Sequence, residues 1–149
     1  MRYLTFALAK GRLANKTLEL LEKTGITCEA MKDKNSRKLI FVNEDLKLKF
    51  FLAKASDVPT YVEYGAADIG IVGEDTILEE GRNLYEVMDL GFGKCRFALA
   101  VKKGSNFYEG YSVKTVATKY PGVARSFFAE KGMDVEIIKI EGSVELAPL

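Results

Sequence analysis

The stretch SDVPTYVEYGAADIGIVGEDT, residues 56–76, predicts a short helix followed directly by a buried strand. Its first two residues are types that favour a helix N-cap, Pro59 suits a first helical turn, and Gly65 suits a helix end. Residues 67–72 then form an apolar run broken only by one aspartate and one glycine. Such a run is typical of a strand covered on both faces, so the stretch predicts an α/β fold.

The residues after this strand form a candidate ligand loop. They are Gly73, Glu74, Asp75 and Thr76, and an amphipathic helix is predicted from Ile77. Open α/β sheets bind ligands at the carboxyl ends of their strands, which is where this loop stands. The alternative is a turn whose acidic residues complement the dipole of the following helix, and the residues taken alone favour that alternative.

A second candidate ligand loop lies near the start of the chain. Residues 4–9 predict a buried strand, and Lys10, Gly11 and Arg12 separate it from a helix that runs to about residue 24. Backbone N–H groups at a helix N-terminus favour anions, whereas cations there oppose the helix dipole. A bound anion would account for the two cations, and simple solvation is the alternative.

The rest of the chain predicts more strands and one more long helix. Residues 38–42 and 46–52 indicate a hairpin with one wet face. Further strands are predicted at 84–90, 95–101, 115–118 and 135–140, a helix at 121–132, and the start of another helix after residue 143. The GFGK sequence at 91–94 lacks the third glycine and the following helix of a dinucleotide-binding fingerprint, so a crossing between two lobes suits it better.

Composition limits the classes of function. The chain has 149 residues, of which 48% are hydrophobic and 29% charged, as is ordinary for a globular protein. Its 22 basic and 21 acidic residues leave a net charge of +1, so neither nucleic acid nor a membrane is expected as a partner. No apolar stretch approaches membrane-spanning length and no secretory signal is visible, so we expect a cytoplasmic protein.

The residues that commonly carry catalysis or metals are scarce. Histidine is absent, which excludes Ser-His and Cys-His nucleophile pairs within this chain. Cys28 and Cys95 lie too far apart in sequence for metal-ligand spacing, so we expect no protein metal site and two core thiols. Any chemistry must therefore use carboxylates, lysine, arginine and backbone donors.

Five motifs in order resemble the ATP phosphoribosyltransferase family. They are ALAKGRL at 7–13, the DVPxYVxxGxADIGIxGxD pattern at 57–75, GKCRFALA at 93–100, VATKYPGVARSFFAEKG at 116–132 and GSVELAPL at 142–149. The absence of a regulatory extension makes the chain similar to the short form of the catalytic subunit. The resemblance extends over essentially the whole chain.

The resemblance implies a glycosyltransferase reaction, the first step of histidine biosynthesis. N1 of ATP attacks the anomeric carbon of phosphoribosyl pyrophosphate, giving phosphoribosyl-ATP and pyrophosphate, with Mg²⁺ carried on the pyrophosphate. The attacking nitrogen bears no proton, so no strong general base is needed and no catalytic residue is assigned. The resemblance places substrate contacts at Lys10, Gly11, Arg12, Gly73, Glu74 and Asp75 in one lobe, and at Arg96, Thr118, Lys119, Glu141, Gly142 and Ser143 in the other.

The resemblance also implies an architecture and partners. We expect a two-lobed α/β fold like that of type II periplasmic binding proteins, with lobes at 1–92 and 93–149. In the family a phosphate-binding loop follows the APL motif, so we expect a second lobe truncated before that loop. Homo-oligomers, and hetero-oligomers with a regulatory subunit resembling histidyl-tRNA synthetase, are implied. The alternatives are a non-catalytic small-anion or nucleotide-binding module and an inactive fragment of the enzyme.

Overall fold

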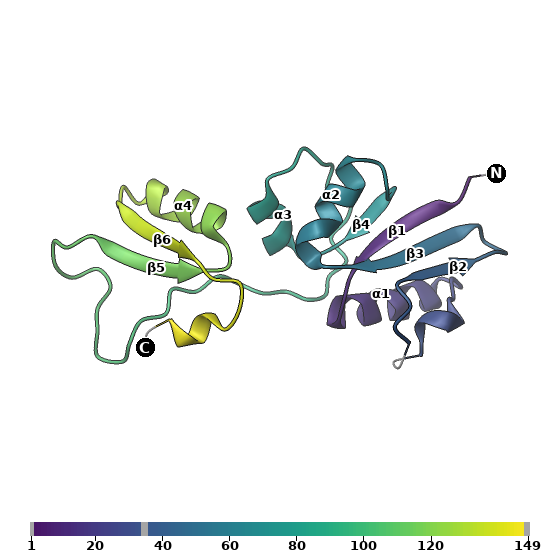
Figure 1. Cartoon of the computed structure of the whole chain (residues 1–149), viewed down its shortest axis with the longest axis horizontal. Coiled ribbons are helices and arrows are strands. Elements are labelled where there is room, and N and C mark those ends of the chain that lie inside the picture. Colours follow the sequence, from purple (N-terminus) through teal and green to yellow (C-terminus); the bar gives the residue numbers. More distant parts are fainter. Residues whose placement is uncertain (1, 34–35, 148–149) are drawn as a thin grey trace. The chain divides into compact units, whose positions relative to one another are not determined.

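The chain forms two units, Met1–Lys94 and Cys95–Leu149, each with a sheet of its own (Figure 1). The structure is a computed structural model that describes residues 2–33 and 36–147. The last two residues of the GSVELAPL motif lie outside the described residues. The α/β class predicted from the sequence is confirmed. The assignment of 1–92 and 93–149 as ligand-binding lobes stays a prediction.

A four-stranded mixed sheet organises the first unit, in the order β2-β3-β1-β4. Its strands are β1 (Leu4–Ala9), β2 (Ile40–Asn43), β3 (Leu48–Ala53) and β4 (Ile69–Ile71). β1 lies between β3 and β4 and runs parallel to both, whereas β2 pairs antiparallel with β3. The predicted hairpin is therefore confirmed, and three strands end at the same edge of the sheet.

Helices and 3-10 turns connect or follow these strands. They are α1 (Arg12–Lys23), the 3-10 turns η1 (Glu29–Met31) and η2 (Ala55–Asp57), α2 (Val58–Glu63) and α3 (Glu74–Glu80). Gly65 has φ +74° and follows the end of α2, as the sequence predicted. The predicted side-chain N-cap is not formed, because η2 runs directly into α2 and Asp57 makes no capping hydrogen bond.

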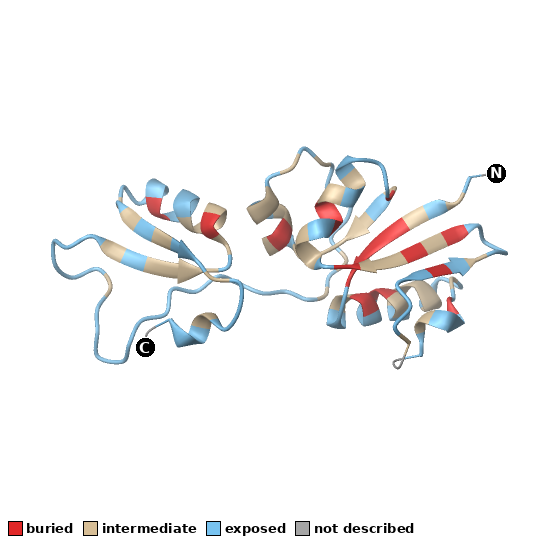
Figure 2. Ribbon diagram, viewed as in Figure 1, coloured by how far each residue is buried: buried red, intermediate tan, exposed pale blue. Residues whose placement is uncertain are grey.

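The core of the first unit lies on both faces of β1 (Figure 2). On one face, Phe6 and Leu8 pack with Phe50 of β3, and the rings of Phe6 and Phe50 stack 5.2 Å apart. On the other face, Ala7 and Ala9 pack with Val58 of α2. Small side chains on this second face let the short α2 approach the sheet closely. The expected burial of the first strand is confirmed for residues 6–9, whereas Leu4 is 40% exposed.

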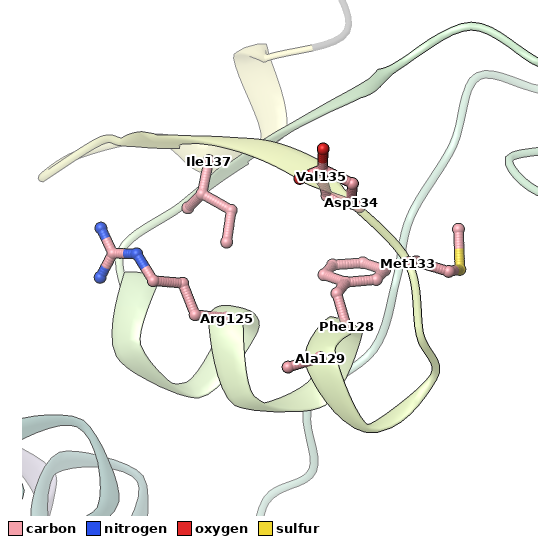
Figure 3. A pocket seen from close by; sticks show the side chains of 7 residues that line it. All are labelled: Arg125, Phe128, Ala129, Met133, Asp134, Val135 and Ile137. Atoms are coloured by element: carbon pink, nitrogen blue, oxygen red, sulfur yellow. The ribbon is translucent and has the colours of Figure 1, made fainter.

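The second unit is smaller. It contains β5 (Lys114–Thr118), α4 (Pro121–Glu130), β6 (Val135–Lys139) and the 3-10 turn η3 (Val144–Leu146). β5 and β6 are parallel, with Val116 opposite Ile137. Phe128 is the buried anchor of α4, and the ring of Phe107 lies 5.6 Å from it. A cavity of about 320 Å³ opens between α4 and β6, where Phe128 and Ile137 face it (Figure 3).

Two strands predicted from the sequence are wrong. Residues 84–90 and 95–101 have no strand pairing. Tyr85 is 98% exposed and Phe97 is 49% exposed, so side chains suited to a sheet face solvent instead. A strand needs a neighbouring strand for its backbone hydrogen bonds, and no described segment of this chain supplies one here.

Gly70 allows α2 to pack on β4. A Cβ atom at this position would lie 2.8 Å from Cγ2 of Val62 and 2.9 Å from Cγ1 of Val58. We expect Gly70→Ala to lower the free energy of unfolding by about 1–3 kcal/mol, because the added methyl overpacks this contact. Thermal or denaturant unfolding measures the effect. Gly142→Ala is the control, since a Cβ there meets no atom within 4 Å, and an equal loss in both variants would contradict the packing argument.

The two cysteines differ, which corrects the expectation that both are core thiols. Cys28 is buried and burial raises the pKa of its thiol, whereas Cys95 is exposed. A raised pKa leaves less of the reactive thiolate at neutral pH. We expect a thiol reagent to modify Cys95 rapidly and Cys28 only when the chain unfolds. Cys95→Ser should remove the fast phase of thiol modification. If that variant still reacted rapidly, the fast reaction could not be assigned to Cys95.

Candidate functional site

One edge of the first sheet gathers three loops. The pairing of Ala9 with Ala53, and of Leu8 with Ile71, aligns the carboxyl ends of β1, β3 and β4. The backbone N–H of Lys10 donates to the carbonyl of Ala53 at 3.0 Å, which ties the first loop to the second. Ligands of α/β sheets bind at such an edge. The register thus places Lys10–Arg12 and the loops after β3 and β4 together.

The loop formed by Lys10, Gly11 and Arg12, here called the KGR loop, presents cations beside an uncapped helix. Lys10 and Arg12 are exposed, and Arg12 is the first residue of α1. Gly11 is the N-cap residue, makes no side-chain cap, and has φ 101° and ψ −143°. This conformation is essentially restricted to glycine. Free N–H groups at the start of a twelve-residue helix and two adjacent cations together favour an anion.

Glu74 and Asp75 do not lie in a loop, which corrects the sequence interpretation. They form the first turn of α3, and Gly73 is its N-cap residue. A Cβ at Gly73 would collide with Oδ1 of Asp75, so that carboxylate folds back over the start of the helix. Carboxylates there complement the helix dipole, as the alternative interpretation proposed. They suit a ligand's hydrogen-bond donors rather than its phosphates.

Lys54 is a residue of this edge that the sequence interpretation missed. It is exposed and directly follows Ala53, the last residue of β3. Applying the carboxyl-end rule to β3 would have found Lys54, but that requires knowing that β3 runs parallel to β1. Cations therefore follow two of the three strands at this edge.

The second unit gathers five predicted residues at the carboxyl ends of its two strands. Thr118 ends β5 and Lys119 follows it, and Glu141, Gly142 and Ser143 follow β6. The backbone N–H of Ile140 donates to the carbonyl of Thr118 at 3.0 Å, which holds the two loops together.

The Thr118 hydroxyl accepts a hydrogen bond from the backbone N–H of Tyr120 at 3.0 Å. A hydroxyl can donate a second hydrogen bond through its own proton. Glu141 forms an ion pair with Lys139, with 2.9 Å between its Oε1 and the lysine Nζ. This edge therefore offers hydroxyls, a lysine and backbone N–H groups.

Arg96 lies in the unpaired segment rather than in the predicted strand. It is exposed, and its neighbour Phe97 packs edge-on against the ring of Tyr120, with centroids 5.1 Å apart. Tyr120 is the N-cap residue of α4 and follows Lys119. The aromatic contact therefore holds the segment that carries Arg96 beside the start of α4, where N–H groups favour anions.

Two cavities, one in each unit, lie away from these two edges. The cavity in Figure 3 is lined by residues of α4 and β6, among them Arg125 and Phe128. A second, of about 460 Å³, lies at the amino ends of the strands in the first unit and includes Arg2, Thr5 and Asp68. Neither is lined by a residue predicted to contact substrate.

The described residues contain neither a cluster of metal ligands nor a membrane-spanning helix. Across 2–33 and 36–147, no three histidine, cysteine, aspartate or glutamate side chains are grouped so that they could hold a metal ion. None of the helices in the same residues combines the length and the apolar composition needed to cross a membrane.

Comparison with known proteins agrees with the resemblance seen in the motifs. The family model described as ATP phosphoribosyltransferase matches residues 54–149. The ATP phosphoribosyltransferase of Lachnoclostridium phytofermentans is 62% identical over 152 residues, covering 100% of this chain and 70% of the relative. That of Clostridium kluyveri is 57% identical over 148 residues, covering 99% of this chain and 67% of the relative.

A solved structure shares the fold. The structure described as an ATP phosphoribosyl transferase (HisG:HisZ) complex from Thermotoga maritima contains a chain that superposes with a TM-score of 0.72 and 32% sequence identity. The match covers 98% of this chain and 68% of that chain. The sequence motifs, the relatives and the fold therefore indicate the same family.

The conformation of Gly11 gives a direct test of the KGR loop. We expect Gly11→Ala to lower the free energy of unfolding by about 1–3 kcal/mol, because a Cβ is strained at this φ and ψ. Denaturant unfolding measures the loss. Asn15→Ala, a change of an exposed residue in the same part of α1, should have little effect. Equal stability of Gly11→Ala and the unchanged chain would show that the loop adopts another conformation.

Proposed function

The chain belongs to the ATP phosphoribosyltransferase family, and on that premise we propose that its two sheet edges hold the two substrates of phosphoribosyl transfer. The family's activity is the first step of histidine biosynthesis, in which N1 of ATP displaces pyrophosphate from phosphoribosyl pyrophosphate. One observation carries the proposal. Each unit brings predicted contact residues to the carboxyl ends of parallel strands, where α/β sheets bind ligands.

In the first unit, Lys10 and Arg12 are proposed to bind phosphate oxygens of the nucleotide or of the pyrophosphate. Both are exposed beside the uncapped start of α1, so their charges and the helix N–H groups act on one anion. The carboxylates of Glu74 and Asp75 are proposed to accept hydrogen bonds from hydroxyl or amino groups. Their place at the start of α3 separates them from the loop that carries the cations.

In the second unit, the loops after β5 and β6 are proposed to contact the other substrate. Thr118 and Ser143 supply hydroxyls, and Lys119 supplies a positive charge. Gly142 leaves open space around its backbone, since a Cβ there would meet no atom within 4 Å. A phosphate can therefore approach the main chain closely at this point. Glu141 and Arg96 complete the predicted set at this edge.

This arrangement suits the chemistry of the reaction. The attacking N1 of ATP carries no proton, so the chain needs to orient two polyanions in line and to stabilise charge on the departing pyrophosphate. Lysine, arginine and N–H groups at strand ends do this without a general base.

Mg²⁺ is proposed to arrive with phosphoribosyl pyrophosphate, because this ion is usually bound through substrate phosphates and waters rather than by an all-protein cage. When bound, it neutralises charge on the pyrophosphate oxygens.

The proposed architecture is the two-lobed type II periplasmic-binding-protein arrangement with an incomplete second lobe. A sheet of two strands is smaller than sheets that usually stand alone, which supports that proposal. The T. maritima relative is described as a complex with HisZ, and we propose a HisZ-type regulatory subunit as this chain's partner in the cytoplasm. Homo-oligomerisation is proposed from the family resemblance.

An activity assay tests the proposed function. The purified chain is incubated with ATP, phosphoribosyl pyrophosphate and Mg²⁺, with and without a HisZ-type subunit, and phosphoribosyl-ATP is measured by mass spectrometry. We expect product to depend on the chain. ATP binding without product in either condition would instead favour a non-catalytic nucleotide-binding module, and loss of both binding and product would favour an inactive fragment.

Charge removal in the KGR loop tests its proposed role. We expect Lys10→Ala and Arg12→Ala each to weaken nucleotide binding by about 10-fold or more, because each removes a charge-assisted hydrogen bond to phosphate. Titration calorimetry with ATP measures the change. Lys16→Ala removes the same charge from an exposed position farther along α1 and should leave affinity nearly unchanged. Unchanged affinity in both loop variants would show that ATP does not bind at this loop.

A further inference from the structure

The turn at residues 90–93 is the place where the segment leading out of the first unit packs on that unit. Throughout residues 85–101, every residue is exposed except Leu90 and Phe92, which are half-buried. The first unit ends directly after this turn, at Lys94. The chain is therefore anchored on the first unit just before it leaves it.

Gly93, the last residue of this turn, meets the first turn of α1. A Cβ atom at Gly93 would lie 2.8 Å from Cδ2 of Leu13, which is the second residue of that helix. Non-bonded carbon atoms pack at about 3.5–4.0 Å, so a glycine is needed here to leave room for Leu13. Gly91 has a similar positive φ, but a Cβ there would meet no atom within 4 Å. Of these two glycines, only Gly93 stands against α1.

Leu13 connects this turn to the KGR loop. Its side chain packs against the core cluster that contains Ala9 of β1 and Ala53 of β3, and it directly follows the loop in sequence. The first hydrogen bond of α1 closes over it, because the N–H of Asn15 donates to the carbonyl of Gly11 at 3.3 Å. The Leu13 side chain thus has the sheet on one side and the turn at 90–93 on another. A segment distant in sequence therefore helps to fix where α1 begins.

We propose that Gly93 is a positioning residue for the KGR loop and acts through Leu13. Because Gly93 has no side chain, the turn closes against Leu13 and keeps the first turn of α1 on the sheet. Arg12 and the uncapped N–H groups then keep a fixed place beside Lys10. Groups that are held in place bind a polyanion better than groups that must first be ordered. The effect on binding rests on the proposed nucleotide site, whereas the contact itself can be tested without substrate.

Amide hydrogen exchange in the free chain tests the contact. The amide of Asn15 reports on the first turn of α1, because it forms the first hydrogen bond of that helix. We expect Gly93→Ala to speed its exchange by about fivefold or more, since the added methyl displaces Leu13 and loosens this turn. Gly91→Ala is the matched control, because it also places a Cβ at positive φ but meets no atom within 4 Å. Equal exchange of the Asn15 amide in the two variants would overturn the proposal.

Shortening Leu13 tests whether the effect passes through that side chain. Leu13→Val removes Cδ2, which is the only described atom within 4 Å of a Cβ at Gly93. In that background, Gly93→Ala and Gly91→Ala should give the same exchange rate at Asn15, because the overlap is gone. Leu13→Ala is a second background that removes the same atom. A difference between the two glycine variants that persists in both backgrounds would show that Gly93 acts by another route, and would overturn the proposal.

Nucleotide affinity tests the consequence for the proposed site. By titration calorimetry, we expect Gly93→Ala to bind ATP about fivefold or more weakly than Gly91→Ala does, and Leu13→Val to remove that difference. Equal ATP affinities of the two glycine variants, with different exchange at Asn15, would overturn the positioning role. If the unchanged chain does not bind ATP, the proposed nucleotide site is wrong instead, and the exchange rates at Asn15 alone decide whether Gly93 holds the loop.

Discussion

The parallel pairing of β1 with both of its neighbours is the constraint on which the first unit depends. β1 is buried on both faces, by Phe50 and α1 on one side and by α2 on the other. A strand in this position fixes where β3 and β4 end, because parallel strands in register finish at the same edge. The three loops at that edge are therefore brought together by core packing.

The chemistry that we propose needs only such placement. Two polyanionic substrates are held by charge and by N–H groups, and a nucleophile without a proton needs no base. Lys10 and Arg12 oppose the dipole of α1, so an anion between them relieves an unfavourable arrangement. Glu74 and Asp75 instead complement the dipole of α3. One edge thus offers both a place for phosphate and a place for hydrogen-bond donors.

The two units differ in how completely they are covered. The first has core clusters on both faces of its sheet, whereas the second has two strands and one helix packed around Phe128. A parallel sheet usually has both faces covered. Ile138 of β6 is exposed, and so is much of 84–101. These surfaces share one physical cause, because apolar residues suited to a sheet lack a neighbouring strand or helix.

The sequence by itself determined the family, the α/β class, most strands and helices, and the loops that carry Lys10, Arg12, Thr118 and Lys119. Apolar runs and glycine stops are local signals, so they can be read without knowing what lies alongside. Only the tertiary structure decided that β3 runs parallel to β1 and brings Lys54 to the same edge. It also placed Glu74 in a helix and left 84–101 unpaired. These features depend on which distant segments pair, and local periodicity carries no record of a strand's partner.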